Sequence, residues 1–172
     1  MKTQQSNRWV DRKFEFEGLE GTYVNILERL WGTPLRLRAK VAGMKNEDLT
    51  RNPEGKWSIQ VHSGHLLTLE SLWLGRLDDF VRGATDLRAW NPTNEETELA
   101  KFNDQDLAVV LDDFEMIRLG MVKVLRKLEG QEESLTALHP RLKTPMRLLD
   151  MVYFIAEHDD HHLATIERIK GS

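Results

Sequence analysis

Apolar residues recur at steps of three and four in four separate stretches of the chain, and no stretch alternates strictly between apolar and polar residues. Steps of three and four place apolar side chains on one face of an α-helix, whereas alternation is typical of a half-buried strand. The pattern therefore predicts an all-α protein. The expected helices extend from about Gly18 to Gly43, from Ser58 to Gly83, from Asn103 or Asp104 to Gly130, and from Thr144 to Lys170.

Several residues at the ends of these stretches commonly begin or end helices. Ser58 suits the N-cap of the second helix, and Gly83 suits its end. Thr144 is the expected cap of the fourth helix, with Pro145 at its first position. Pro34 is placed to kink the first helix.

Four amphipathic helices of about twenty-five residues each most simply make one four-helix bundle. The connections between them are long. The one between the second and third helices has about twenty residues, more than an antiparallel turn needs, which fits a crossover. Its acidic run, residues 94–98, is expected to belong to a solvated linker.

Composition narrows the classes of function. A chain of 172 residues has the length of one domain, so residues 1–172 are expected to form a single domain. The chain has no cysteine, which excludes disulfides, thiolate metal sites and a cysteine nucleophile. A formal net charge of -4 argues against nucleic acid as the partner, because phosphate contacts need a basic face. No apolar run is long enough to cross a membrane and the first residues are polar, so we expect a cytoplasmic protein without a membrane partner.

Two of the six histidines fall on the apolar face of the fourth expected helix. His158 and His162 are one helical turn apart on or beside this face, whereas His161 points away from it. Two imidazoles buried side by side lose hydration and repel each other if both are charged, and a shared cation removes both costs. The pair predicts a metal site, whose third ligand has to come from another helix.

The second expected helix offers two histidines for that third position. His62 also suits packing against Trp57 at the start of the helix, whereas His65 lies on the flank of the apolar face. Periodicity leaves the choice open, because His62 is nearer the centre of that face. At 1.5 Å per residue, His65 reaches the height of His158 and His162 only if the second and fourth helices are antiparallel. A three-histidine site therefore predicts this arrangement.

At these positions the chain resembles the DinB-like (DinB/YfiT) family of metal-binding four-helix bundles. The matching pieces are Trp57-Ser58-Ile59, Gly64-His65-Leu66 with Glu70, His139-Pro140, and Ala156-Glu157-His158-Asp159-Asp160-His161-His162-Leu163. The resemblance implies that His65, His158 and His162 are the metal ligands. It also implies a homodimer and a divalent ion, with nickel or zinc before iron, cobalt or manganese. Its better characterised members are transferases or isomerases that use low-molecular-weight thiols.

Three histidines without a fourth protein ligand leave coordination positions open for water or substrate, as in catalytic metal sites. Candidates for orienting a ligand or taking a proton are Glu70, Glu157, Asp159 and Asp160, and the sequence does not choose among them. The leading hypothesis is a metal-dependent transferase using a small thiol, or a hydrolase, acting on a small molecule. The alternative is a non-catalytic dimeric interaction module or stress-associated protein whose histidines are packing groups. His139 is expected in a loop, and the tryptophans are expected to be packing residues.

Overall fold

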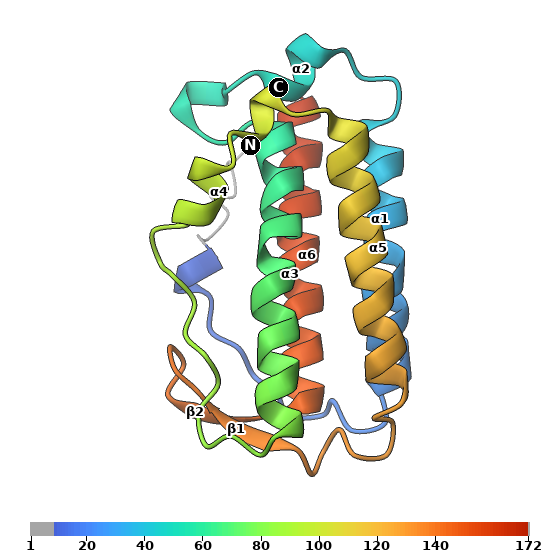
Figure 1. The fold of residues 1–172 in the computed structure, drawn as a ribbon, viewed down its shortest axis with the longest axis vertical. Helices are drawn as coiled ribbons and strands as arrows, with labels where there is room; N and C mark the ends of the chain where they lie inside the picture. The colour runs from blue at the N-terminus through green and yellow to red at the C-terminus, as the bar shows by residue number, and fades with distance from the viewer. Residues whose placement is uncertain (1–8, 172) are drawn as a thin grey trace, which may run out of the picture.

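Four long helices dominate residues 9–171, the part of the chain that the computed structural model describes (Figure 1). The first and second of them each pack against the third and fourth, so the four close into a bundle. The expectation of a mostly helical bundle is confirmed. The long helices are α1 (Tyr23–Val41), α3 (Ile59–Val81), α5 (Leu107–Arg126) and α6 (Leu148–Lys170).

The directions of the helices follow from their contacts and from Figure 1. His62 contacts His162, and Trp73, further along α3, contacts Phe154, which lies earlier on α6. Residue numbers therefore rise on α3 as they fall on α6, which is the order of antiparallel neighbours. In Figure 1, α1 and α6 run upwards, and α3 and α5 run downwards.

Because α3 and α5 point the same way, the chain between them has to return along the whole bundle. This connection contains a short helix, α4 (Glu95–Leu99), which packs against α3. The acidic side chains of α4 are exposed, as the solvated-linker interpretation expects, but Thr97 is 2% exposed and faces the bundle. A crossover thus brings a buried polar side chain to the surface of α3.

The connection between α5 and α6 contains a two-stranded antiparallel sheet, which departs from the all-α expectation. Its strands are β1 (Thr136–His139) and β2 (Thr144–Arg147). The prediction that Thr144 and Pro145 begin the last helix is wrong. Pro145 pairs with Leu138 in the sheet, and Arg147 precedes α6, with its backbone N–H donating to Asp150. A proline is tolerated here because both strands are edges.

Other helix boundaries differ from the expected ones for local reasons. Helix α1 begins at Tyr23 because Gly18 and Gly21 have φ of 76° and 75°, which a right-handed helix does not contain. The helix continues through Pro34. Helix α5 begins after Asp106, whose carboxylate accepts a hydrogen bond from the N–H of Ala108. By contrast, Ser58 caps α3 as expected.

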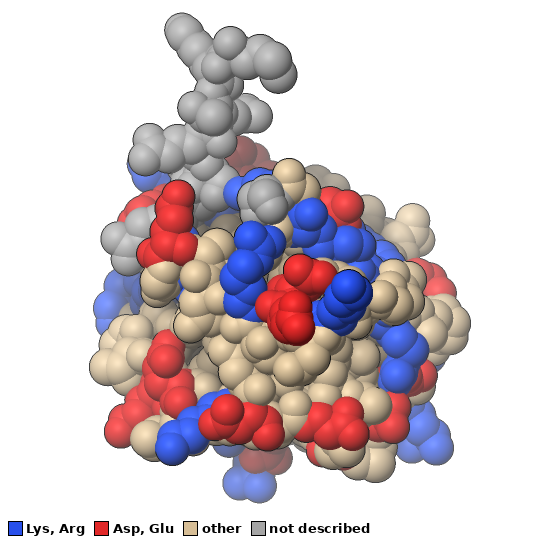
Figure 2. Space-filling view, turned by 90° about the horizontal axis from the view of Figure 1, so that it is seen from above, with Lys and Arg blue, Asp and Glu red and all other residues tan. Residues whose placement is uncertain are grey.

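Apolar side chains fill the centre of the bundle along its length. Side chains of both charge signs are interspersed on its upper end (Figure 2). Within residues 9–171, no helix combines the length and apolar character that a membrane span requires. The other short helical elements of the described segment are α2 (Asn46–Thr50) and the 3-10 turns at Trp9–Asp11, Pro53–Gly55 and Phe102–Asp104.

Candidate metal centre

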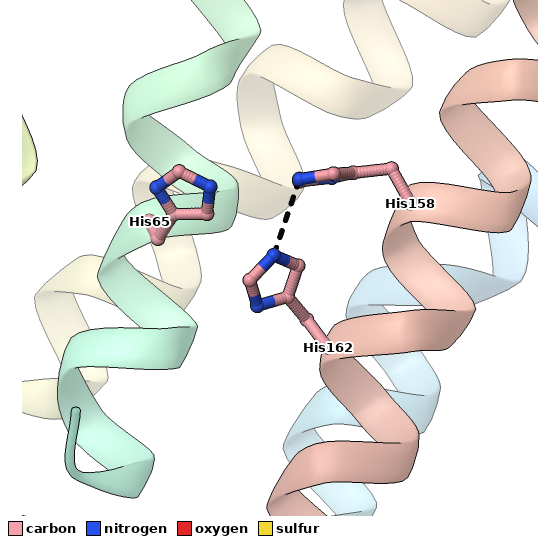
Figure 3. A group of neighbouring side chains, drawn as sticks. All are labelled: His65, His158 and His162. Atoms are coloured by element: carbon pink, nitrogen blue, oxygen red, sulfur yellow. Dashed lines mark hydrogen bonds between the residues drawn. The ribbon is translucent and has the colours of Figure 1, made fainter. Parts of the chain in front are cut away.

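Three histidine side chains converge between α3 and α6. His65 comes from α3, and His158 and His162 come from successive turns of α6 (Figure 3). One ring nitrogen from each can be chosen so that all three lie within 4.8 Å of one another. The Nε2 atoms of His158 and His162 are 3.1 Å apart. The structure thus brings together the three histidines that the resemblance selects.

These separations fit a single divalent ion. Two ligand nitrogens bonded at ~2.0–2.1 Å to a tetrahedral ion lie ~3.3 Å apart. The two histidines of α6 already have about this spacing, at 3.1 Å. Because the widest separation is 4.8 Å, His65 has to approach by no more than ~1.5 Å. Three imidazoles suit zinc, nickel, cobalt or iron, so the donor set leaves the identity of the metal open.

A hydrogen bond to Thr97 orients His65. The Nδ1 atom of His65 lies 2.9 Å from Oγ1 of Thr97, and both side chains are buried. When the hydroxyl oxygen accepts a hydrogen bond from Nδ1–H, the proton of the neutral ring is on Nδ1. The lone pair of Nε2 is then free to bind a metal. Sequence reasoning missed Thr97, because its place beside His65 depends on the path of the crossover.

His62 plays a comparable part for His162. Their Nδ1 atoms are 2.9 Å apart, so His62 contacts the nitrogen of His162 that faces away from His158. If Nε2 of His162 holds a metal, its Nδ1 carries a proton and donates it to His62. Periodicity could not separate the two histidines of α3. In the structure His65, His158 and His162 form the candidate metal-binding set, whereas His62 contacts His162 from outside this set and also contacts Trp57.

Burial keeps these histidines neutral. It lowers the pKa of His65 to about 3 and the pKa of His62 to about 4. Burial also lowers the pKa values of His158 and His162 well below the usual value, and neighbouring histidines lower them further. Neutral imidazole is the form that coordinates a metal, so the site needs no loss of protons at neutral pH.

Aromatic rings surround the three histidines. The ring centroids of Trp57 and His65 are 4.7 Å apart, those of Trp9 and His158 are 5.0 Å apart, and those of Trp73 and His158 are 5.8 Å apart. These tryptophans pack, as expected, but they pack around the site and form its apolar shell. An apolar shell excludes water and strengthens electrostatic interactions within the site.

The three histidines line a cavity of about 1170 Å³. The remaining sides of the cluster therefore face a space large enough for a small organic molecule. His161 lies on the cavity wall against Trp9, with ring centroids 5.8 Å apart, and does not belong to the metal-binding set. His139 also lines the cavity, and it ends strand β1 instead of lying in a loop.

Two of the candidate carboxylates belong to a buried ion network. Arg118 of α5 is fully buried and binds both Glu70 of α3, at 2.6 Å, and Asp159 of α6. Asp159 also accepts a hydrogen bond from Thr33 of α1 at 2.9 Å. Burial lowers the pKa of Arg118, but the two carboxylates outweigh it and raise the pKa above its usual value. Both carboxylates are therefore engaged by a permanent cation.

The other two candidates are held by arginines at the edge of α6. Glu157 pairs with Arg12 and Arg29, and Asp160 pairs with Arg29 and Arg36, with N–O distances of 2.5 to 2.7 Å. Burial raises the pKa values of both carboxyls, but the arginines hold them below the usual range. None of the four candidates lines the cavity, whose described wall contains a single carboxylate, that of the exposed residue Glu54.

The sequence pattern of the DinB superfamily matches residues 29–166 of this chain. The matched segment contains all four long helices except the ends of the first and last, together with the three clustered histidines. This match covers well over half of the chain, and the chain therefore belongs to the DinB superfamily.

A solved structure with a similar fold is described as "YfiT from Bacillus subtilis", "a probable metal-dependent hydrolase with an unusual four-helix bundle topology". The two chains superpose with a TM-score of 0.79 over 92% of this chain and 91% of that one, at 18% sequence identity. At this identity the likeness establishes a common fold. No curated protein sequence matches the chain significantly.

Proposed function

We propose that this protein is a metal-dependent hydrolase that acts on small organic molecules at a three-histidine centre. The observation that carries the proposal is the convergence of His65, His158 and His162, all buried, on the wall of one large cavity. The related fold of YfiT, described as a probable metal-dependent hydrolase, supports the same class of reaction.

A divalent ion held by His65, His158 and His162 would supply Lewis-acid chemistry, because such an ion lowers the pKa of a bound water or thiol towards neutrality. The protein's own contribution is positional. Thr97 and His62 fix two of the three imidazole rings, at 2.9 Å each, and the tryptophans keep bulk water from the cluster. Neutral rings at pH 7 avoid competition between protons and the metal.

A second candidate function is that of a transferase using a small thiol, because none of the four candidate carboxylates is free to act as a base at the three histidines. A hydrolase commonly uses a carboxylate base near its metal, whereas a thiol that has lost its proton needs none for its attack. The four candidate carboxylates all pair with arginines and lie off the cavity wall. Because the chain has no cysteine, the sulfur has to come from a separate small molecule. The homodimer implied by the family resemblance remains a prediction.

One panel of assays separates these functions. Metal-free protein is loaded in turn with zinc, nickel, manganese and iron(II), and each form is given p-nitrophenyl acetate or glutathione with chlorodinitrobenzene. We expect turnover of at least one reaction, its loss in His65→Ala, and its retention in His161→Ala. Ester turnover assigns the hydrolase, and thiol-dependent turnover assigns the transferase. If equilibrium dialysis detects no metal binding and neither reaction shows turnover, the proposal is contradicted and a non-catalytic module is favoured.

A further inference from the structure

Three arginines line the same cavity, and none of them forms an ion pair with a carboxylate among the described residues. Arg168 of α6 is exposed to solvent, whereas Arg76, on α3, is buried and Arg141, in the turn between the two strands, is half-buried. Arg76 is 2% exposed, and its Nε donates to the backbone oxygen of Arg88 at 3.1 Å. The carboxylate that acts on it electrostatically, Asp79, is already bound by Arg88 at 2.7 Å.

A second buried guanidinium in this fold, that of Arg118, shows which partners Arg76 lacks. Arg118 lies as deep as Arg76, and it has two carboxylates in direct contact, Glu70 and Asp159. Buried charges in proteins are ordinarily paired in this way, because removal from water is costly. Burial, together with the charge of Arg141, lowers the pKa of Arg76 to about 10, so it is still charged at pH 7. The cavity thus contains a buried cation without an anion.

Two further donors beside Arg76 also lack partners. Nη1 of Arg141 donates to the backbone oxygen of Val10 at 3.2 Å, whereas its Nη2 is buried with no partner among the described residues. His139 is 1% exposed, and its Nδ1 accepts hydrogen bonds from the N–H groups of Arg141 and Leu142. Its proton therefore lies on Nε2, which is likewise buried and unpartnered.

These donors lie one layer of aromatic rings away from the three histidines. The guanidinium of Arg76 lies 5.5 Å from the ring centroid of Trp73, and that of Arg141 lies 5.8 Å from that of Phe154. The two rings contact each other, with centroids 6.2 Å apart, and Trp73 also contacts His158. A molecule in the cavity can therefore reach the donors and the histidines at once while its middle lies against apolar rings.

We propose that Arg76, Arg141 and His139 bind the anionic head group of the substrate, which is a small organic acid with an apolar body. The fork of guanidinium donors matches a carboxylate or a phosphate group, and both share the required chemistry. The apolar body lies against Trp73 and Phe154, and the reacting bond points to the histidines. This last part rests on the proposed function, whereas the binding of the anion does not depend on a metal.

Calorimetry on the metal-free protein tests the proposal with three probes of one size class. These are phenylpropionate, its neutral amide and phenyl phosphate, each compared with inorganic phosphate. We expect an acid to bind at least tenfold more tightly than the amide. Tighter binding of phenylpropionate or of phenyl phosphate distinguishes the two head groups. Equal binding of acid and amide overturns the proposal, and inorganic phosphate as tight as either aryl acid means an adventitious ion only.

Variants locate the binding. Arg76→Met and Arg141→Met are each expected to weaken binding of the preferred acid tenfold or more. Arg126→Met, which removes the same charge outside the cavity, is expected to retain it. An equal loss in Arg126→Met would mean general attraction by charge and would overturn the assignment. Arg141→Lys, in a half-exposed turn, provides a second test if Arg76→Met fails to fold, and we expect it to bind more tightly than Arg141→Met.

Metal binding is measured on the same variants, so that the two proposals fail separately. Arg141→Met is expected to bind zinc as the unmodified protein does, and His65→Ala is expected to bind the acid without binding zinc. Acid binding without any turnover in the metal-loaded protein leaves this inference standing and contradicts the proposed function. Turnover of neutral esters without binding of the acids supports the proposed function and overturns the inference of an anion site.

Discussion

Replacing Thr97 by valine is expected to weaken metal binding without emptying the site of any ligand. Valine has nearly the shape of threonine but cannot accept the proton of His65 Nδ1, which lies 2.9 Å from the hydroxyl oxygen. With both groups buried, no solvent replaces the lost partner. Removing a hydrogen-bond partner of a metal-bound histidine typically weakens metal affinity about 10- to 100-fold, or ~1.4 to 2.8 kcal/mol.

The same change also affects stability. An unpaired buried donor costs about 1 to 3 kcal/mol, which for a chain of this size lowers Tm by roughly 2 to 12 °C. Affinity therefore has to be measured well below the melting transition, by competition for zinc against a chromophoric chelator. Thr97→Ser keeps the hydroxyl and is expected to retain affinity within about threefold.

Thr165→Val is the matched control. Thr165 also lines the cavity, but its hydroxyl donates to the backbone oxygen of His161 and not to a member of the metal-binding set. We expect this variant to bind zinc normally. An unchanged affinity in Thr97→Val, or an equal loss in Thr165→Val, would refute the view that Thr97 sets the orientation of His65.

Three further outcomes follow from the same geometry. His158→Ala is expected to abolish zinc binding and His161→Ala to preserve it, as measured by dialysis and elemental analysis, and equal losses would contradict the helical phase. The metal-free protein is expected to lose stability as pH falls from 6.5 to about 4, because the histidines of the unfolded chain then bind protons, whereas the buried His62 and His65, with pKa values of about 4 and 3, stay neutral. Urea denaturation should show a loss of about 1.4 kcal/mol in the free energy of unfolding per pH unit for each histidine. A free energy of unfolding that does not change over this pH range would disprove the neutrality of the two rings. Arg118→Met is expected to cost about 3 to 5 kcal/mol in thermal or urea unfolding, because two buried carboxylates lose their cation, whereas Arg126→Met at an exposed pair should cost less than about 1 kcal/mol.

Local sequence signals predicted those parts of the fold that depend on neighbouring residues. Helical periodicity placed His158 and His162 on the buried face of α6, and the N-cap preference of serine placed the start of α3 at Ser58. The same local reasoning failed at Pro145. Thr144-Pro145 is a good helix start in isolation, but the preceding segment 136–139 pairs with it as a strand. Pairing across a turn is a tertiary effect that the helix-start signal does not contain.

The parts of the site that sequence reasoning missed are those made by distant segments. Thr97 is 32 positions from His65, and nothing in an acidic run marks one threonine as buried. Likewise, the sequence proposed four carboxylates as bases without indicating that arginines hold each of them. Arg12 reaches Glu157 across 145 positions, a pairing set only by the packed bundle. The unpaired arginines of the cavity are recognisable only once such partners are known.

The buried network around Arg118 also bears on how the bundle assembles. Arg118 comes from α5, its carboxylates come from α3 and α6, and the backbone oxygen of Leu30 on α1 approaches it at 3.5 Å. A folding intermediate in which α3 or α6 is undocked leaves a charge of this network buried without one of its partners. Partial docking of the helices is therefore costly. We expect the four long helices to unfold as one cooperative unit, so that melting curves followed by different spectroscopic probes coincide.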